Sequence, residues 1–196
     1  MGTNRIEAFS DGVIAIILTV MVLELKIPTT ASVAALKAVL PTLLSYTLSF
    51  LIIAIMWVNH HHLMHLAKHP TAAVLWTNNN LLFWMSLIPF VTAFLGQTHG
   101  AALAVAAYGL VLTFSAVAFT LLRVAIVRGR LGHASAEVQE QDRRAMQKSL
   151  WANMLYGASV PLAFVHPYIS FFIFLLIPAM YFVPEGKIEE LAAALR

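Results

Sequence analysis

Six apolar stretches, separated by short polar connections, make up most of the chain. A helix that crosses the hydrocarbon of a bilayer needs about 20 mostly apolar residues. Segments of roughly this length cover residues 6–25, 38–63, 72–96, 101–127, 150–165 and 168–183. Because little sequence is left outside them, the pattern predicts one all-α integral membrane domain, residues 1–196, with six transmembrane helices per subunit.

The composition excludes several other classes of protein. Hydrophobic residues make up 60% of the 196 residues and charged residues 11%, whereas a typical soluble domain is about 45–50% apolar and about 25% charged. So few charges cannot cover a soluble globule, which argues against a soluble enzyme, a disordered segment or a nucleic-acid-binding module. The chain has no cysteine, so disulfides, thiolate metal sites and cysteine nucleophiles are excluded.

The positive charges lie mostly on one side of the predicted membrane. With six spans, only Lys26 and Lys37 fall on the other side, which leaves ten of the twelve Lys and Arg residues on the side of the termini. By the positive-inside rule, both termini are expected in the cytoplasm, and the chain in the cell (inner) membrane. Glu7 and Asp11, with no small-residue cleavage site before Glu24, favour a retained first helix over a cleaved signal peptide.

Two polar segments are expected to form short surface helices. The connection after the fourth span, residues 128–148, begins a stretch at Ser135 that has an N-cap residue followed by acidic residues, which is typical of a helix start. We expect a short interfacial helix there, leading into the fifth span. The tail, residues 184–196, is expected to form a second short helix in the cytoplasm.

The first apolar segment has two distinct faces. At 100° per residue, one continuous stripe of a helix contains Gly12, Ile16, Thr19, Val20 and Leu23. Ser10 and Asp11 fall on the other side of the helix, where polar groups inside a membrane need partners from neighbouring helices. Periodicity alone leaves open whether the stripe packs on lipid, on a partner helix or around a symmetry axis.

The start of this segment resembles a known family. Arg5-Ile-Glu-Ala-Phe9-Ser10-Asp11-Gly12 is similar to the R-x-x-x-F-S-D-G signature of bacterial relatives of transmembrane protein 175, an endosomal and lysosomal potassium channel. The resemblance continues at Trp57-Val-Asn-His60-His61, at Asn80-Leu-Leu-Phe and at Pro89-Phe90. It covers all six predicted spans in their layout and length.

The resemblance implies a potassium-permeable cation channel and no enzyme. Four six-helix subunits would form a homotetramer in the lipid bilayer, with the first helices lining one pathway for potassium ions and with no re-entrant selectivity-filter loop, no cofactor and no metal. The hydrophobic constriction would fall at Ile16, further rings would fall at Val20 and Leu23, and Thr19 would contribute to cation discrimination. Without carbonyl ligands, the expected preference for potassium over sodium is modest.

The resemblance also implies a hydrogen-bond network at the motif. Its members on the first helix belong to the Arg5, Phe9, Ser10, Asp11 and Gly12 signature. Their expected partners on the second and third spans are Trp57, His60 or His61, and Asn80.

Two other functions are compatible with the residues alone. A proton-coupled secondary transporter would use Asp11 and a histidine as a relay, although such folds usually have paired broken helices. A membrane metal or haem protein would use a cluster of imidazoles on one helix. That cluster consists of His60, His61, His62, His65 and His69. No carboxylate lies within this stretch of sequence, which counts against a metal site.

Overall fold

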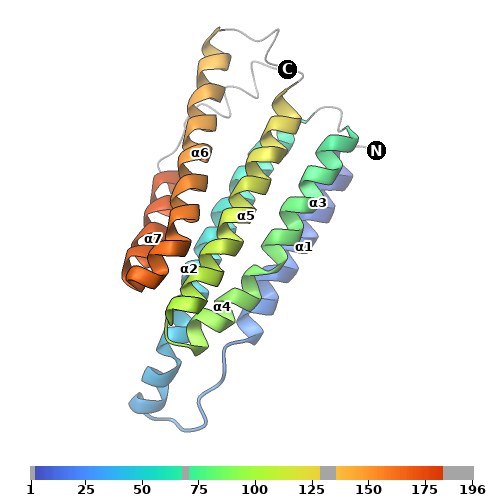
Figure 1. Cartoon of the computed structure of the whole chain (residues 1–196). Helices are drawn as coiled ribbons and strands as arrows, with labels where there is room; N and C mark the ends of the chain where they lie inside the picture. The colour runs from blue at the N-terminus through green and yellow to red at the C-terminus, as the bar shows by residue number, and fades with distance from the viewer. Residues whose placement is uncertain (1–2, 68–70, 129–135, 183–196) are drawn as a thin grey trace.

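The computed structural model describes residues 3–67, 71–128 and 136–182, and the regular structure in these ranges is α-helical. The elements are α1 (Thr3–Leu23), α2 (Val33–His65), α3 (Ala72–Ser86), α4 (Ile88–Gln97), α5 (Ala102–Val127), α6 (Ala136–Val165) and α7 (Pro167–Phe182). They run up and down in one elongated bundle (Figure 1), in which α1 lies on the side away from α6 and α7. The predicted all-α architecture is confirmed.

The third predicted span is divided into two helices. Leu87 ends α3 and also caps the start of α4, and Pro89 lies in the first turn of α4. Proline has no backbone N–H for the carbonyl four residues earlier, and its ring clashes with that carbonyl, so a continuous helix cannot pass this point undisturbed. The two helices still follow one another as a single apolar stretch from Ala72 to Gln97.

Within the described residues, four stretches are long and apolar enough to cross a membrane: α1, α2, the α3–α4 pair and α5. The other two predicted spans belong to α6, which is 30 residues long, and α7, which is 16. In place of a separate short helix before the fifth span, α6 is one continuous helix that begins at Ala136 and joins a charged start to an apolar end. The helix predicted for residues 184–196 lies outside the described residues.

Basic residues gather at one end of the bundle. The end of α5 and the start of α6 lie at the same end of the bundle as the start of α1 (Figure 1), and this end carries Arg123, Arg128, Arg143 and Arg144. Lys37 belongs to the first turns of α2, at the far end of the molecule. The arrangement in space therefore reproduces the charge asymmetry along the sequence.

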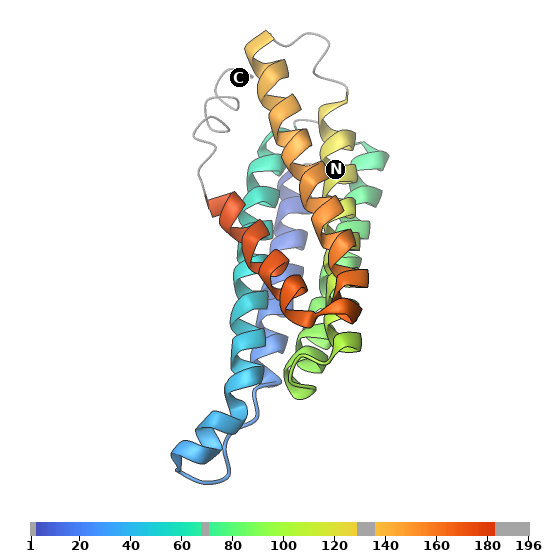
Figure 2. The ribbon, with the colours of Figure 1, turned by 60° about the vertical axis from the view of Figure 1, so that its left-hand side comes forward.

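Close packing around α5 holds the bundle together. This helix contacts α3, α4 and α6, and the view in Figure 2 shows α6 and α7 crossing in front of the helices behind them. A Cβ atom added at Gly109 would lie 2.5 Å from the hydroxyl oxygen of Ser159. Glycine at this position therefore allows the close approach of α5 and α6. The first helix, α1, packs mainly on α2, α3 and α4.

Candidate functional site

One face of α1 is buried in its own chain and the opposite face is exposed. The buried residues follow helical spacing: Ile6, Ser10, Ile14, Ile17 and Met21. The predicted stripe lies on the uncovered side. Ile16 is 63% exposed, Val20 is 40% exposed and Leu23 is 80% exposed, and Thr19 and Gly12 are also exposed. A single subunit therefore leaves most of this apolar stripe uncovered by the described part of the chain.

The hydroxyl group of Thr19 has its proton committed within the helix. Thr19 Oγ1 donates to the backbone oxygen of Ile16 over 2.9 Å. A hydroxyl group has one proton and two lone pairs, so the lone pairs of this oxygen stay available on the exposed face. Thr19 can offer an acceptor, and so a cation ligand, along an otherwise aliphatic stripe.

An open groove runs beside the stripe. It has a volume of about 760 Å³ and lies between α1 and the α3–α4 pair. Ile16 and Val20 line it on one side, Phe90 and Phe94 line it on the other, and Glu24 lies at the end away from the basic residues. The uncovered surface of α1 is therefore continuous with a largely apolar surface of α4.

Polar side chains fasten the first turns of α1 to α2 and α3. Trp57 Nε1 donates to Asp11 Oδ1 over 2.8 Å. Asn78 Nδ2 donates to Ser10 Oγ over 3.0 Å, and the Ser10 hydroxyl donates to the backbone oxygen of Ile6 over 2.8 Å. His60 Nε2 lies 2.8 Å from Asn78 Oδ1, and because that oxygen only accepts, the imidazole is the donor.

The members of this network differ in part from those expected. Asn78, and not Asn80, joins Ser10 to His60, since Asn78 is 1% exposed whereas Asn80 lies on the exposed side of α3. Two positions along a helix are about 200° apart, so both cannot face α1. Arg5 is also exposed, and Phe9, at 58% exposure, lies two turns before Ile16 on the side of the stripe.

His61 contacts a residue that the sequence analysis did not place in the network. Its Nδ1 atom lies 2.8 Å from Glu7 Oε1. Glu7 lies on α1, one turn before Asp11. An acidic residue such as Glu7 next to an apolar span indicates that a polar partner is present. The sequence does not show that this partner is His61 on α2.

A second buried polar group joins α2, α4 and α5. The hydroxyl oxygen of Ser49 lies 2.7 Å from that of Thr92 and 2.8 Å from that of Tyr108. All three side chains are buried. Because a buried hydroxyl without a partner is costly, these contacts fix α4 against the bundle just after the break at Leu87. Sequence reasoning missed this group, since single hydroxyls in apolar spans carry no pattern.

Ion pairs organise the charged start of α6. Arg123 on α5 donates to Asp142 on α6 over 2.6 Å, with both side chains mostly buried. On the exposed side, Arg143 and Arg144 both donate to Glu140, and these hydrogen bonds hold the pKa of that carboxyl below its usual range. The basic end of the bundle is therefore partly neutralised from within.

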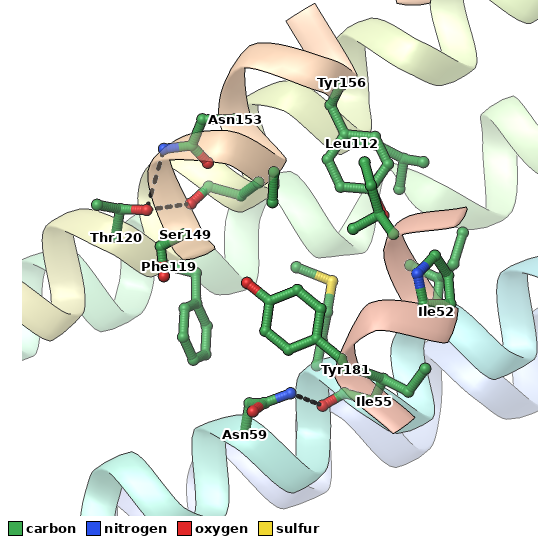
Figure 3. A pocket seen from close by; sticks show the side chains of 15 residues that line it. Ile52, Ile55, Asn59, Leu112, Phe119, Thr120, Ser149, Asn153, Tyr156 and Tyr181 are labelled. Atoms are coloured by element: carbon green, nitrogen blue, oxygen red, sulfur yellow. Dashed lines mark hydrogen bonds between the residues drawn. The ribbon is translucent and has the colours of Figure 1, made fainter. Parts of the chain in front are cut away.

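A pocket of about 60 Å³ lies on the other side of the bundle, among α2, α5, α6 and α7. Figure 3 shows Asn153 and Thr120 bonded to one another at its edge, and the ring of Tyr181 near Ile55. The side-chain amide of Asn153 is hydrogen-bonded to Thr120 Oγ1 over 3.0 Å. The lining is largely apolar, and the pocket does not reach the exposed stripe of α1.

Comparisons with known proteins agree on one family. A family model described as the endosomal/lysosomal potassium channel TMEM175 matches residues 5–89. A potassium channel of Chryseobacterium sp. is 38% identical over 97% of this chain and 97% of its own length. A potassium channel of Chamaesiphon minutus is 35% identical over 86% of this chain and 87% of its own length.

Two further matches concern named members of that family. The human endosomal/lysosomal proton channel TMEM175 is 34% identical over 96 residues, which are 42% of this chain and 19% of the human protein. The crystal structure of a lysosomal potassium-selective channel TMEM175 homologue from Chamaesiphon minutus superposes with a TM-score of 0.78 at 30% identity. The match covers 91% of this chain and 95% of that one.

Proposed function

The chain belongs to the TMEM175 family of ion channels, and from this membership we propose that it is a potassium channel whose pathway is lined by α1. Members of this family pass ions, catalyse no reaction and are described with no cofactor. The pathway in this proposal runs between the exposed stripes of α1 from four copies, with Ile16 at the narrowest point and Val20 and Leu23 farther along.

The observation that carries the proposal is the exposure of this stripe opposite a firmly anchored face. Ile16 is 63% exposed, whereas Asp11 and Ser10 are hydrogen-bonded to α2 and α3 of the same subunit. A helix held in this way presents its stripe at a fixed angle. A Cβ added at Gly12 would meet nothing within 4 Å in the single chain, so the subunit itself does not require glycine there. In the proposed tetramer, glycine at position 12 allows the α1 helices of neighbouring subunits to approach closely.

The chemistry of the stripe favours a hydrophobic constriction. Isoleucine offers no ligand to an ion, so potassium crosses with most of its water, and the passage closes when it dewets. The oxygen of Thr19, one turn farther, replaces part of the hydration shell. Discrimination then rests on size and on the cost of removing water, which supports a modest preference for potassium over sodium.

The proposal includes the membrane arrangement. Four stretches meet the length and hydropathy needed for a span, and residues 150–165 of α6 together with α7 supply the fifth and sixth crossings. The single domain, residues 1–196, then has both termini and the basic end in the cytoplasm of a cell with the protein in its inner membrane. A channel that discriminates potassium from sodium at the exposed stripe of α1 needs no re-entrant selectivity-filter loop.

A flux assay paired with a native mass tests the proposal. Purified protein reconstituted in liposomes should pass potassium without a proton gradient, and its native mass should be that of four chains. Flux that saturates and depends on a proton gradient would instead identify a transporter, and a functional monomer would eliminate a pathway shared between copies.

A further inference from the structure

Three ligand groups from two helices meet at the basic end of the bundle. Glu7 of α1 and His61 and His65 of α2 each offer one ligand atom, and these atoms lie within 4.8 Å of one another. His61 Nδ1 lies 2.8 Å from Glu7 Oε1, and His61 Nε2 lies 3.0 Å from His65 Nε2. The sequence predicts a cluster of imidazoles on one helix with no carboxylate nearby. In the fold, Glu7 of α1 brings a carboxylate to His61 and His65.

The positions of the protons follow from the hydrogen bonds. An ionised carboxylate only accepts, so the proton of a neutral His61 lies on Nδ1 and is donated to Glu7. The lone pair of His61 is therefore on Nε2, directed toward His65. A carboxylate that accepts from the far nitrogen of an imidazole is the usual support of a metal-binding histidine, because it fixes the tautomer and the ring orientation.

We propose that Glu7, His61 and His65 form a binding site for a divalent transition-metal ion of the zinc type. The Nε2 atoms of the two histidines are the ligands, and Glu7 orients His61 from behind. Imidazole nitrogens bind zinc at about 2.0–2.1 Å, so two such ligands in a tetrahedron are about 3.3 Å apart. The observed separation of 3.0 Å needs only a small adjustment of two surface rings.

The site is accessible from water and leaves room for further ligands. His65 is exposed, and the side chain of His61 is 41% exposed. Water molecules can therefore complete the coordination. Two imidazole ligands select ions such as Zn²⁺, Ni²⁺ and Cu²⁺ over Mg²⁺ and Ca²⁺, which prefer sets of oxygen ligands.

Neighbouring histidines provide a contrast within the same helix. His60 is fully buried, and its Nε2 atom is already committed to Asn78. His62 touches His61 through a tilted ring contact, with centroids 5.8 Å apart. His62 is therefore a matched control: it is an imidazole of the same cluster that lies outside the proposed ligand set.

Metal bound to His61 strengthens the link between α2 and α1, because it fixes the imidazole that is hydrogen-bonded to Glu7. Glu7 belongs to α1, and both ligands belong to the end of α2. Binding then favours the docked position of α1, because an ion that binds only the folded arrangement stabilises it by mass action.

The test is a titration of the purified full-length protein, in detergent at pH 7.5, with Zn²⁺ and separately with Mg²⁺. The dissociation constant is measured by competition with a zinc-sensitive dye, and the unfolding temperature is recorded with and without Zn²⁺. The variants are His65→Ala, Glu7→Gln and the control His62→Ala.

Parent protein and His62→Ala should bind one Zn²⁺ per chain and unfold at a higher temperature with it, while Mg²⁺ has no effect. His65→Ala should lose the site, and Glu7→Gln should bind at least about tenfold more weakly. The proposal is overturned if His65→Ala binds as tightly as the parent, if His62→Ala alone loses binding, or if the parent binds no Zn²⁺.

Discussion

The replacement of Asn78 by leucine tests how α1 is anchored. Asn78 donates to Ser10 and accepts from His60, and both partners are 0% exposed. Leucine has the branched shape of asparagine but no polar atom, so the variant removes two hydrogen bonds without leaving a large cavity. Asn80→Leu is the matched control, because it makes the same chemical change two positions away on the exposed side of α3.

The magnitude follows from the two hydrogen bonds that the substitution removes. Hydrogen bonds between membrane helices contribute about 0.6 kcal/mol on average and about 1.7 kcal/mol at most. Two bonds give about 1–3 kcal/mol for Asn78→Leu, since Ser10 and His60 keep no replacement for the amide in a buried site. For Asn80→Leu we expect less than about 0.5 kcal/mol, as is usual for an exposed position.

The assay is unfolding of the purified protein in mixed micelles, followed by helical circular dichroism, with the fraction of assembled protein measured by native mass. Asn78→Leu should lower both stability and assembly relative to the parent, and Asn80→Leu should change neither. If Asn80→Leu is the more harmful of the two, the anchoring described for Ser10 and His60 is wrong.

Two other substitutions separate permeation from assembly. Ile16→Asn should raise the potassium conductance and weaken the preference for potassium over sodium, because an amide keeps the constriction wet; single-channel recordings check this, with Val22→Asn on another face of α1 as the control. Unchanged currents from an assembled Ile16→Asn protein would remove Ile16 from the constriction. Asp11→Ala should reduce the assembled fraction more than it alters permeation, since Trp57 loses its acceptor, while Asp11→Asn keeps an acceptor and should assemble. An assembled Asp11→Ala channel with altered selectivity would contradict the anchoring role of Asp11. Native mass measures assembly, and reversal potentials measure ion selectivity.

The faces of α1 could be predicted from the sequence because both follow from helical periodicity. Gly12, Ile16 and Leu23 repeat at the spacing of helical turns, which places them on one side of a helix whatever surrounds it. The structure leaves Ile16 and Leu23 on that side uncovered. The family motif added the identity of Trp57, whose indole reaches Asp11 over 2.8 Å.

Other features depend on contacts that a single sequence does not encode locally. Motif spacing predicts Asn80 as the asparagine of the hydrogen-bond network. The rotation of α3 against α1 decides which asparagine faces inward, and in the structure that residue is Asn78. The break at Leu87 was missed because prolines such as Pro89 are often tolerated in membrane helices. The pairing of Glu7 with His61 joins residues 54 positions apart, and no pattern along one helix can reveal it.

The most direct test of the shared pathway uses the absence of cysteine in the parent chain. A single cysteine is introduced at Ile16→Cys and, as a control, at Leu110→Cys, where the side chain on α5 is also exposed, at 45%. Each variant, in liposomes, is treated with a short bifunctional maleimide, and the products are separated by mass under denaturing conditions. If four α1 helices surround one pathway, Ile16→Cys gives covalent dimers while Leu110→Cys stays monomeric. Monomers alone from an assembled Ile16→Cys protein would contradict the account.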